Sequence, residues 1–401
     1  MRSLFSIVTA IIMLFHAGLM GQTQVNPVVK EEMIALNKQM KTDRLVVSMQ
    51  NECVINETYR GNPDALFPLY SITKVFSSLA IGILIDQKKI PHCEVPVATY
   101  YPVWAKDSLK SKITIRHVLQ HTSGIEAANG SQLIYPESDF VAYALNQPVR
   151  VPAGTVFFYN NTAYNLLSGI VQKVSGLPLS DFIQKNVFQP LEISNYSWNK
   201  DATGQTWGMD GLAMNATDLL KIGQLLSQKG LWKGNRIISE QWCTMMFQIP
   251  LTNAMAQKYG YAMGIRCLPF QEVIQIPKTT LEQLEHINPN DKALKVLWKM
   301  ADTSWTYLTL GNALSESLSV TEIERITTLA YQFHLPLYEI QNQNFYLQHG
   351  GEFGHLLAIY PKQDKVLVRL LGEKWGRKKN DSQTEYRYSI DTPLINYLLK
   401  L

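Results

Sequence analysis

The clearest pattern along the chain is a helical spacing of apolar residues that begins near Ser71 and ends at the polar run 86–89. Its apolar positions are Val75, Phe76, Leu79, Ala80, Ile83 and Leu84. The same spacing predicts helices over 166–174, 179–188 and 216–228, and a last helix over 392–399. Between residues 91 and 245, helical stretches alternate with turns rich in Pro and Gly. The middle of the chain is therefore predicted to be helical.

Strand-like segments, which are apolar and rich in β-branched residues, lie near both ends of the chain. They cover 46–55, 259–267, 345–348, 356–360 and 366–371. The sequence shows no internal repeat and no low-complexity linker. We therefore expect an α/β sheet domain assembled from residues 26–90 and 246–401, with an all-helical domain of residues 91–245 inserted between its two parts.

The first residues differ in kind from the rest of the chain. Arg2 supplies a positive charge, 4–15 form an apolar run, and small residues follow at 18–21. This order predicts a signal peptide over residues 1–21 and an exported protein, periplasmic or extracellular. An uncleaved anchor is the alternative, although the run is shorter than the roughly 20 residues that span a bilayer. No other segment is apolar enough to span, so we expect no stable membrane span in the mature chain.

Composition narrows the class of protein. Of 401 residues, 46% are hydrophobic and 17% are charged, which excludes a disordered chain. The net charge of +4 is small for a nucleic-acid-binding protein, and we expect no nucleic-acid partner. The one dense basic cluster, residues 374–379, is interpreted as a solvated loop.

The four cysteines give no motif for metal binding or redox chemistry. Cys53, Cys93, Cys243 and Cys267 are widely separated and form no C-x-x-C pair. An exported protein permits disulfides, and the sequence leaves their pairing open. His117 and His121 have the i, i+4 spacing of a metal site, but the H-E-x-x-H pattern of zinc proteases is absent. We therefore predict no metal site.

Candidate chemistry begins at Ser71-Ile72-Thr73-Lys74. A serine hydroxyl becomes a useful nucleophile when a base lies beside it, and a lysine three residues later on a helix lies on the same face. Ser197-Trp198-Asn199-Lys200 has the same spacing but is followed by polar residues instead of an apolar helix. Context therefore favours Ser71, with an ordinary helix-capping serine as the alternative.

Two further motifs supply complementary groups. In Tyr159-Asn160-Asn161, a tyrosine near a lysine ammonium can act as a general base, and the Asn161 amide can donate to a substrate carbonyl. In His349-Gly350-Gly351, the glycines let a substrate approach a strand edge, where a backbone N–H can contribute to an oxyanion hole. Taken alone, the Tyr159 motif is most often a turn with a buried aromatic, and His349 is equally well explained as a packed surface histidine.

In order, these motifs resemble those of the serine β-lactamase and penicillin-binding-protein superfamily, and most of all its class C β-lactamase and D-alanyl-D-alanine carboxypeptidase branch. The segment 113–125, ITIRHVLQHTSGI, is similar to a signature of that branch. The likeness covers 45–267 and 345–371. It implies a β-lactamase/transpeptidase-like fold of the α/β (α+β) type, an antiparallel sheet flanked by helices with an inserted helical domain.

The resemblance also implies roles for individual residues. Ser71 would attack a carbonyl and form an acyl-enzyme, while Lys74 and Tyr159 would share the proton transfers. The backbone N–H groups of Ser71 and Glu352 would form the oxyanion hole. Asn161, His349, Gly350 and Gly351 would contact the substrate. Which of Lys74 and Tyr159 is the base stays open. The chemistry that the resemblance implies needs no metal and no organic cofactor.

One departure limits what the resemblance implies about substrates. The K-T-G or K-S-G motif of class C β-lactamases is absent, and His349 takes the lysine's place. A mainly neutral histidine recognises a substrate carboxylate less well than a lysine. The leading prediction is therefore a β-lactamase-related serine hydrolase acting on small amide, peptide or ester substrates near the cell wall. The alternatives are a weak β-lactamase or D-Ala-D-Ala carboxypeptidase, and a non-catalytic sensor that binds wall peptides or β-lactams.

Residues 268–344 lie outside the resemblance. Two capping boxes, Thr279 with Glu282 and Ser319 with Glu322, predict helices there. We expect a helical insertion within the α/β part. Because the insertion enters directly before the third motif, we hypothesise that it packs beside the active-site cleft and limits substrate size. A peripheral helical addition is the alternative.

Overall fold

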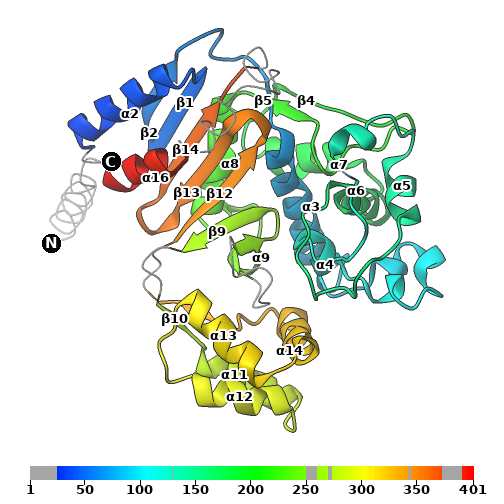
Figure 1. The fold of residues 1–401 in the computed structure, drawn as a ribbon. Helices are drawn as coiled ribbons and strands as arrows, with labels where there is room; N and C mark the ends of the chain where they lie inside the picture. The colour runs from blue at the N-terminus through cyan, green and yellow to red at the C-terminus, as the bar shows by residue number, and fades with distance from the viewer. Residues whose placement is uncertain (1–24, 129, 250–259, 270–272, 342–344, 373–390) are drawn as a thin grey trace, which may run out of the picture.

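The main sheet collects strands from both ends of the chain (Figure 1). The computed structural model describes residues 25–128, 130–249, 260–269, 273–341, 345–372 and 391–401. Seven antiparallel strands pair in the order β2-β1-β14-β13-β12-β9-β8. Their bounds are β1 Arg44–Met49, β2 Glu52–Thr58, β8 Gly260–Ala262, β9 Ile265–Pro269, β12 Phe345–Gly351, β13 His355–Tyr360 and β14 Lys365–Leu370. The predicted antiparallel sheet flanked by helices is confirmed.

Two of the predicted strands are hairpins instead. The apolar run 46–55 is divided at Gln50 and Asn51, which both adopt positive φ angles, between β1 and β2. The run 259–267 is divided in the same way before β9, where Gly264 has φ +82°. In both places the hydrophobic pattern continues through a tight turn, so periodicity alone did not reveal the break.

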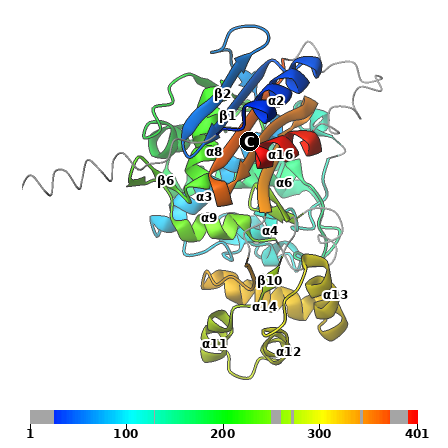
Figure 2. The same ribbon diagram turned by 90° about the vertical axis from the view of Figure 1, so that its left-hand side faces the viewer.

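Helices cover the two faces of this sheet (Figures 1 and 2). Helices α2 (Pro27–Gln39) and α16 (Asp391–Lys400) contact each other, and α16 packs on β13 and β14. Helix α8 (Ala216–Ser227) contacts β1, β13 and β14. Because most residues of β1, β13 and β14 are buried, the sheet forms the middle layer of a three-layer arrangement.

Gly223 of α8 lets this helix approach the sheet closely. A Cβ at this position would lie 2.3 Å from Val366 Cγ1 and 3.1 Å from Leu357 Cδ1, which belong to fully buried side chains. Gly223→Ala should therefore lower the free energy of unfolding by about 1–3 kcal/mol, because overpacking outweighs the better helix propensity of alanine. Denaturant unfolding checks this value. Lys221→Ala on the same helix, which removes a partly exposed ion pair with Asp218, should cost about 1 kcal/mol or less. An unchanged midpoint for Gly223→Ala would contradict the packing argument.

A group of helices packs around the central helix α3 (Lys74–Asp86). Twelve of its 13 residues are buried, and it contacts α6 and α7. The run 179–188 is an α-helical turn that continues as a π-helix over Gln184–Phe188. The helices of this group are α4 Ile115–Leu119, α5 Phe140–Asn146, α6 Asn161–Ser175, α7 Leu179–Ile183 and α9 Glu240–Phe247. The small strands are β3 Phe67–Pro68, β4 Tyr196–Trp198, β5 Leu212–Met214, β6 Leu231–Trp232 and β7 Asn235–Arg236.

The segment between β9 and β12 forms a separate group of helices at one end of the molecule (Figure 2). It contains α11 Lys278–Ile287, α12 Lys292–Met300, α13 Tyr307–Ser317 and α14 Val320–Gln332, with a small pair of strands, β10 Ile274–Gln275 and β11 Glu339–Ile340. The capping box of Ser319 and Glu322 is present at the start of α14. The one expected at Thr279 is wrong, because α11 begins at Lys278 after Pro277 and has no side-chain cap.

Several predictions fall outside the described residues. The expected signal peptide, residues 1–21, and the basic cluster 374–379 are among them. Within the residues that are described, no helix combines the length and apolar character needed to cross a bilayer. Cys93 and Cys243 are buried thiols, and Cys53 is exposed.

Candidate active site

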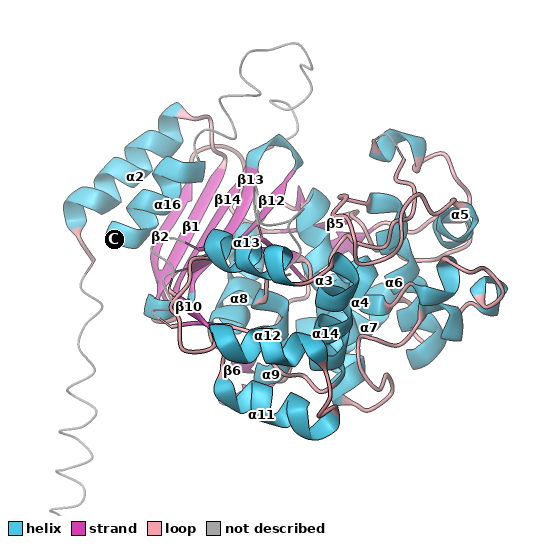
Figure 3. Cartoon of the chain, turned by 60° about the horizontal axis from the view of Figure 1, so that its bottom comes forward, coloured by secondary structure: helices cyan, strands magenta, loops and turns pink. Residues whose placement is uncertain are grey.

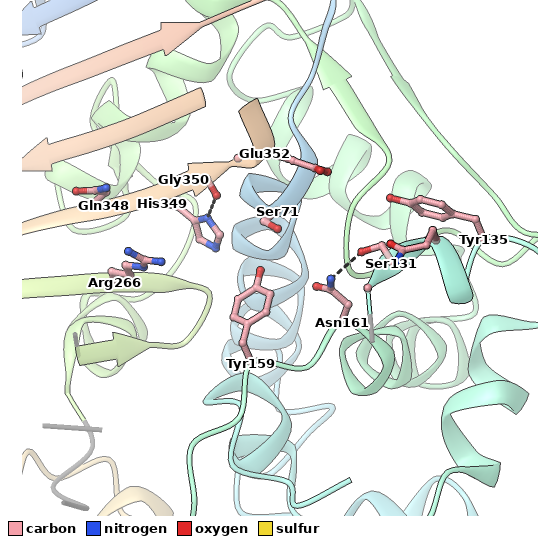
Figure 4. A pocket seen from close by; sticks show the side chains of 13 residues that line it. Ser71, Ser131, Tyr135, Tyr159, Asn161, Arg266, Gln348, His349, Gly350 and Glu352 are labelled. Atoms are coloured by element: carbon pink, nitrogen blue, oxygen red, sulfur yellow. Dashed lines mark hydrogen bonds between the residues drawn. The ribbon is translucent and has the colours of Figure 1, made fainter. Parts of the chain in front are cut away.

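The three motifs meet at a pocket of about 570 Å³ (Figure 4). It lies where the helical group around α3 meets the edge of β12. Side chains or backbone from each motif line it, together with residues that follow α4 along the chain. The lining residues are Ser71, Gly130, Ser131, Gln132, Tyr135, Tyr159, Asn161, Arg266, Gln348, His349, Gly350, Gly351 and Glu352.

Ser71 and Lys74 face each other as the helical spacing predicted. Ser71 lies in a 3₁₀ turn, Tyr70–Thr73, and Lys74 is the first residue of α3. Lys74 Nζ lies 3.4 Å from Ser71 Oγ and donates a second hydrogen bond of 2.8 Å to the Met209 carbonyl. The amine is therefore held beside the hydroxyl by a backbone acceptor from a distant part of the chain.

The environment of Lys74 favours its neutral form. The side chain has no exposed surface, and burial lowers the pKa of Lys74 to about 7, although the nearby Asp210 carboxylate acts in the opposite direction. A lysine with an ordinary pKa would be fully protonated at neutral pH. Here a large fraction of the amine is free to accept a proton.

Tyr159 completes the group from the loop before α6. Its hydroxyl is hydrogen-bonded to Ser71, and Lys74 Nζ lies 4.9 Å from the centre of its ring. The His121 ring stacks on Tyr159 with a centroid distance of 4.4 Å. Burial raises the pKa of Tyr159 to about 12, and the Ser71 hydrogen bond only partly opposes this. At neutral pH the phenol therefore keeps its proton.

Asn161 stands at the first position of α6, after the capping residue Asn160. Its Nδ2 donates a 2.8 Å hydrogen bond to Ser131 Oγ, and both residues line the pocket. Figure 4 shows the Asn161 side chain on the side of Ser71 opposite to His349. The pocket thus has one wall from the helical group and another from the sheet.

His349, Gly350 and Gly351 form the end of β12 along the sheet wall. Nδ1 of His349 lies 3.0 Å from the Gly350 carbonyl oxygen. Burial, reinforced by the charge of Lys74, lowers the pKa of His349 to about 3. His349 is therefore neutral at physiological pH and does not supply the positive charge of the lysine it replaces.

A close approach of backbones brings Glu352 next to Ser71. A Cβ at Gly351 would lie 2.7 Å from the Leu69 carbonyl oxygen, so only glycine allows β12 to come this near to the 3₁₀ turn. Tyr70 and Phe353, which flank Ser71 and Glu352, both have positive φ angles, and their rings pack edge to face at 5.2 Å. Two backbone conformations that are rare for such residues are thus found beside the expected oxyanion donors.

Two charged residues at the site were missed by sequence reasoning. Arg266 of β9 pairs in register with Gln348, the neighbour of His349, and lines the pocket. Asp210 is 7% exposed, accepts a 2.6 Å hydrogen bond from Tyr135 and acts electrostatically on Lys74. Strand pairing brings Arg266 to the pocket, and a contact between segments some 130 residues apart brings Asp210 near Lys74. Neither arrangement leaves a local pattern in the sequence.

The described residues contain no group of three or more His, Cys, Asp or Glu side chains that would suit a metal ion. Nδ1 of His117 accepts from the Thr114 backbone N–H, and Nδ1 of His121 accepts from that of Asn160. Their ring nitrogens therefore serve the structure of this region.

The fold and the arrangement of the motifs define a protein of the serine β-lactamase and penicillin-binding-protein type. The sequence model of the family described as Beta-lactamase matches residues 45–378, more than half of the chain. The chain therefore belongs to the Beta-lactamase family. This membership confirms the resemblance inferred from the motifs.

Individual relatives agree with the family. A penicillin-binding protein of Bacillus subtilis (strain 168) is 33% identical over 140 residues, which is 33% of this chain and 30% of that protein. The 6-aminohexanoate-dimer hydrolase of Paenarthrobacter ureafaciens is 25% identical over 223 residues, 50% of this chain and 56% of that protein. The matched part thus spans between about a third and a half of these relatives.

A solved structure shows the same fold over nearly the whole chain. The octameric penicillin-binding protein homologue from Pyrococcus abyssi superimposes with a TM-score of 0.58 at 17% identity, and covers 92% of this chain and 78% of that one. This likeness shows that the two chains share the fold.

Proposed function

We propose that this protein is a serine hydrolase that cleaves amide or ester bonds through an acyl-enzyme on Ser71. The supporting observation is the group of three side chains in one pocket: a hydroxyl, a desolvated amine 3.4 Å away and a phenol hydrogen-bonded to the same hydroxyl. A nucleophile with a base in reach and a second proton carrier is the arrangement that acyl transfer requires. Its relatives include a dimer hydrolase and a penicillin-binding protein.

The pKa values favour Lys74 as the base in the free enzyme. With its pKa at about 7, Lys74 offers a neutral amine at physiological pH, whereas Tyr159, at about 12, keeps its proton. Ser71 would pass its proton to Lys74 as it attacks the carbonyl carbon. Tyr159, hydrogen-bonded to Ser71, would then relay this proton from Lys74 to the leaving nitrogen or oxygen, as the bond between that atom and the carbonyl carbon breaks. Water attacks the resulting ester by the reverse transfers and regenerates the Ser71 hydroxyl.

The backbone N–H groups of Ser71 and Glu352 would hold the oxyanion of the tetrahedral intermediate. Each such donor contributes about 3 kcal/mol of transition-state stabilisation in enzymes where one has been removed. Asn161, from the helical wall, would contact the acyl part of the substrate. His349, Gly350 and Gly351 would contact the substrate along the strand edge.

Arg266 indicates the kind of leaving group. Because His349 is neutral, it cannot replace the electrostatic role of a lysine toward a carboxylate. Arg266 lines the same sheet wall, and its charge lowers the pKa values of both His349 and Tyr159. A guanidinium binds a carboxylate through two parallel hydrogen bonds. We therefore propose that the leaving group carries a carboxylate, as in a short peptide, which favours a carboxypeptidase-like activity over that of a general esterase.

Arg266→Gln tests this assignment with two substrates. The first substrate is an N-acyl amino acid, whose leaving group carries a free carboxylate. Its kcat/KM should fall about 10- to 100-fold, which corresponds to the loss of one hydrogen bond to a charged group. For a p-nitrophenyl ester of the same acyl group, which has no carboxylate to bind, kcat/KM should stay within about threefold. Equal losses on both substrates would show that Arg266 acts on the catalytic groups and not on the leaving group.

We also propose that the protein acts outside the cytoplasm, near the cell wall. The predicted signal peptide at residues 1–21 and the penicillin-binding relative support this location. Fractionation of cells that produce the full chain tests it: activity in the cytoplasmic fraction alone would contradict export.

A further inference from the structure

Helix α14 of the segment 268–344 docks on α4, beside the active-site region but not in its pocket (Figure 3). Among the described residues, none from this segment lines the pocket that holds Ser71. The described residues of the segment therefore form no wall of this pocket, and α14 packs on the helical group instead. The hypothesis that the segment limits substrate size stays a prediction.

The contact is built on one carboxylate, Glu324, which is 16% exposed. One oxygen, Oε1, accepts from Arg116 at 2.5 Å and from His117 Nε2 at 2.6 Å. Arg116 is in turn paired with the buried Glu94. Burial alone would raise the pKa of Glu324, but the Arg116 charge and the His117 hydrogen bond lower it to about 2.

Neighbouring contacts continue this interface along α14. Thr328 accepts a 3.1 Å hydrogen bond from Arg116, and Tyr331 accepts one of 3.0 Å from Gln120. Tyr331 also lies under the Arg116 guanidinium, whose carbon is 5.2 Å from the ring centre. A buried, charge-assisted network of this kind loses much of its stabilisation when one partner is removed.

The same carboxylate touches the loop that carries Tyr159. A Cβ on Gly154 would lie 2.3 Å from Glu324 Cδ, so Glu324 packs directly against the Gly154 backbone. Gly154 has φ +83°, and its N–H donates a 2.8 Å hydrogen bond to the Thr122 carbonyl. Glu324 thus bridges α4 and the loop 151–160.

Between Gly154 and Asn160, hydrogen bonds join the loop to the residues that follow α4. The Phe158 N–H donates to the His121 carbonyl at 2.8 Å, and the Asn160 N–H donates to His121 Nδ1 at 3.0 Å. Between these two donors lies Tyr159, on whose ring His121 stacks. Hydrogen bonds at Gly154, Phe158 and Asn160 therefore connect the residue that Glu324 touches with the position of the Tyr159 phenol.

We infer that Glu324 is a positioning residue, through which the segment 268–344 holds the Tyr159 loop in its catalytic geometry from behind the site. Glu324 does not touch the substrate. It holds α4 in place through Arg116 and His117, and it supports the loop 151–160 at Gly154. The His121 ring follows α4 in the chain, and the Tyr159 ring lies in the loop. The inference depends on the proposed function only in the role it gives to Tyr159.

The kinetic test compares three variants of the full chain. Glu324→Ala should lower kcat per titrated active site about tenfold with KM changed less than about twofold, because a small misplacement of a proton carrier slows the chemical steps. Glu324→Gln, which keeps an acceptor oxygen for His117, should recover part of this loss. Arg325→Gln is the matched control: it breaks the ion pair with Asp291 inside the segment and leaves α4 untouched.

Arg325→Gln should lower the melting temperature while its kcat per titrated site stays within about twofold of the original protein. An equal kinetic loss in Arg325→Gln would reduce Glu324 to a general stabiliser of the segment. An unchanged kcat in Glu324→Ala would overturn the inference directly.

Amide hydrogen exchange supplies a readout that needs no turnover. In Glu324→Ala the amides of Gly154, Phe158 and Asn160 should exchange about tenfold faster, while in Arg325→Gln they should not. If the original protein forms no acyl-enzyme, the proposed function fails, and the exchange result still decides whether Glu324 orders the loop. Unchanged exchange at these three amides in Glu324→Ala would contradict the inference whatever the activity.

Discussion

Ser71→Ala is expected to reduce kcat by at least about 10⁴-fold, because removing the nucleophile of a serine hydrolase leaves only binding and oxyanion stabilisation. Loss of one small hydroxyl at a half-buried position should leave the fold intact. The measurement is turnover of a p-nitrophenyl ester and of an amide by protein whose circular dichroism and melting temperature match those of the original.

The chain contains its own control for this prediction. Ser197-Trp198-Asn199-Lys200 repeats the S-x-x-K spacing, but Ser197 is exposed on β4 and does not line the pocket. Ser197→Ala should keep full activity. Comparable activity in Ser71→Ala and in the original protein would show that the pocket works without Ser71 as its nucleophile.

Lys74→Met is the second variant with a large expected effect. Methionine fills a similar volume in the buried position but cannot accept the Ser71 proton, and general-base catalysis contributes about 10²- to 10⁴-fold. We expect kcat/KM to fall within this range. The loss of the hydrogen bond to the Met209 carbonyl adds a cost in stability, which thermal unfolding measures separately.

The pH dependence links this loss to the pKa of Lys74. The base is active when neutral, and its pKa of about 7 means that the neutral fraction grows as the pH rises past that value. For the original protein, kcat/KM should therefore rise about tenfold per pH unit below pH 7 and level off above it, and Lys74→Met should lose this rise. A profile that increases only near pH 12 would assign the base to Tyr159 instead.

Local sequence patterns predicted the elements that carry the candidate site residues. The spacing of Ser71 and Lys74 on a helix face, and the position of Tyr159 in the turn before α6, follow from rules that act over a few residues. The strand that ends in His349-Gly350-Gly351 was visible as an apolar run followed by glycines. The meeting of these segments, in contrast, was inferred from the family resemblance, since nothing local brings residue 71 beside residue 349.

What the sequence did not reveal depends on contacts between distant segments. Arg266 reaches the pocket because β9 pairs with β12 in an antiparallel arrangement. The long segment between these two strands in the chain makes their pairing impossible to recognise from the sequence. The Asp210 carboxylate opposes the lowering of the Lys74 pKa by burial, and the two residues are close only because the chain folds around α3. The docking of Glu324 on Arg116 joins residues more than 200 positions apart, and a charged residue on an amphipathic helix gives no sign of a buried partner.

The proposed reaction runs through a covalent acyl-enzyme on Ser71, formed with the help of Lys74. Peptide mapping by mass spectrometry, after brief reaction with a fluorophosphonate or an activated ester, tests it most directly. We expect a single adduct on the peptide that contains Ser71, formed on the folded protein and greatly slowed in Lys74→Met. An adduct confined to another residue, or no adduct with any of these probes on folded protein, would contradict it.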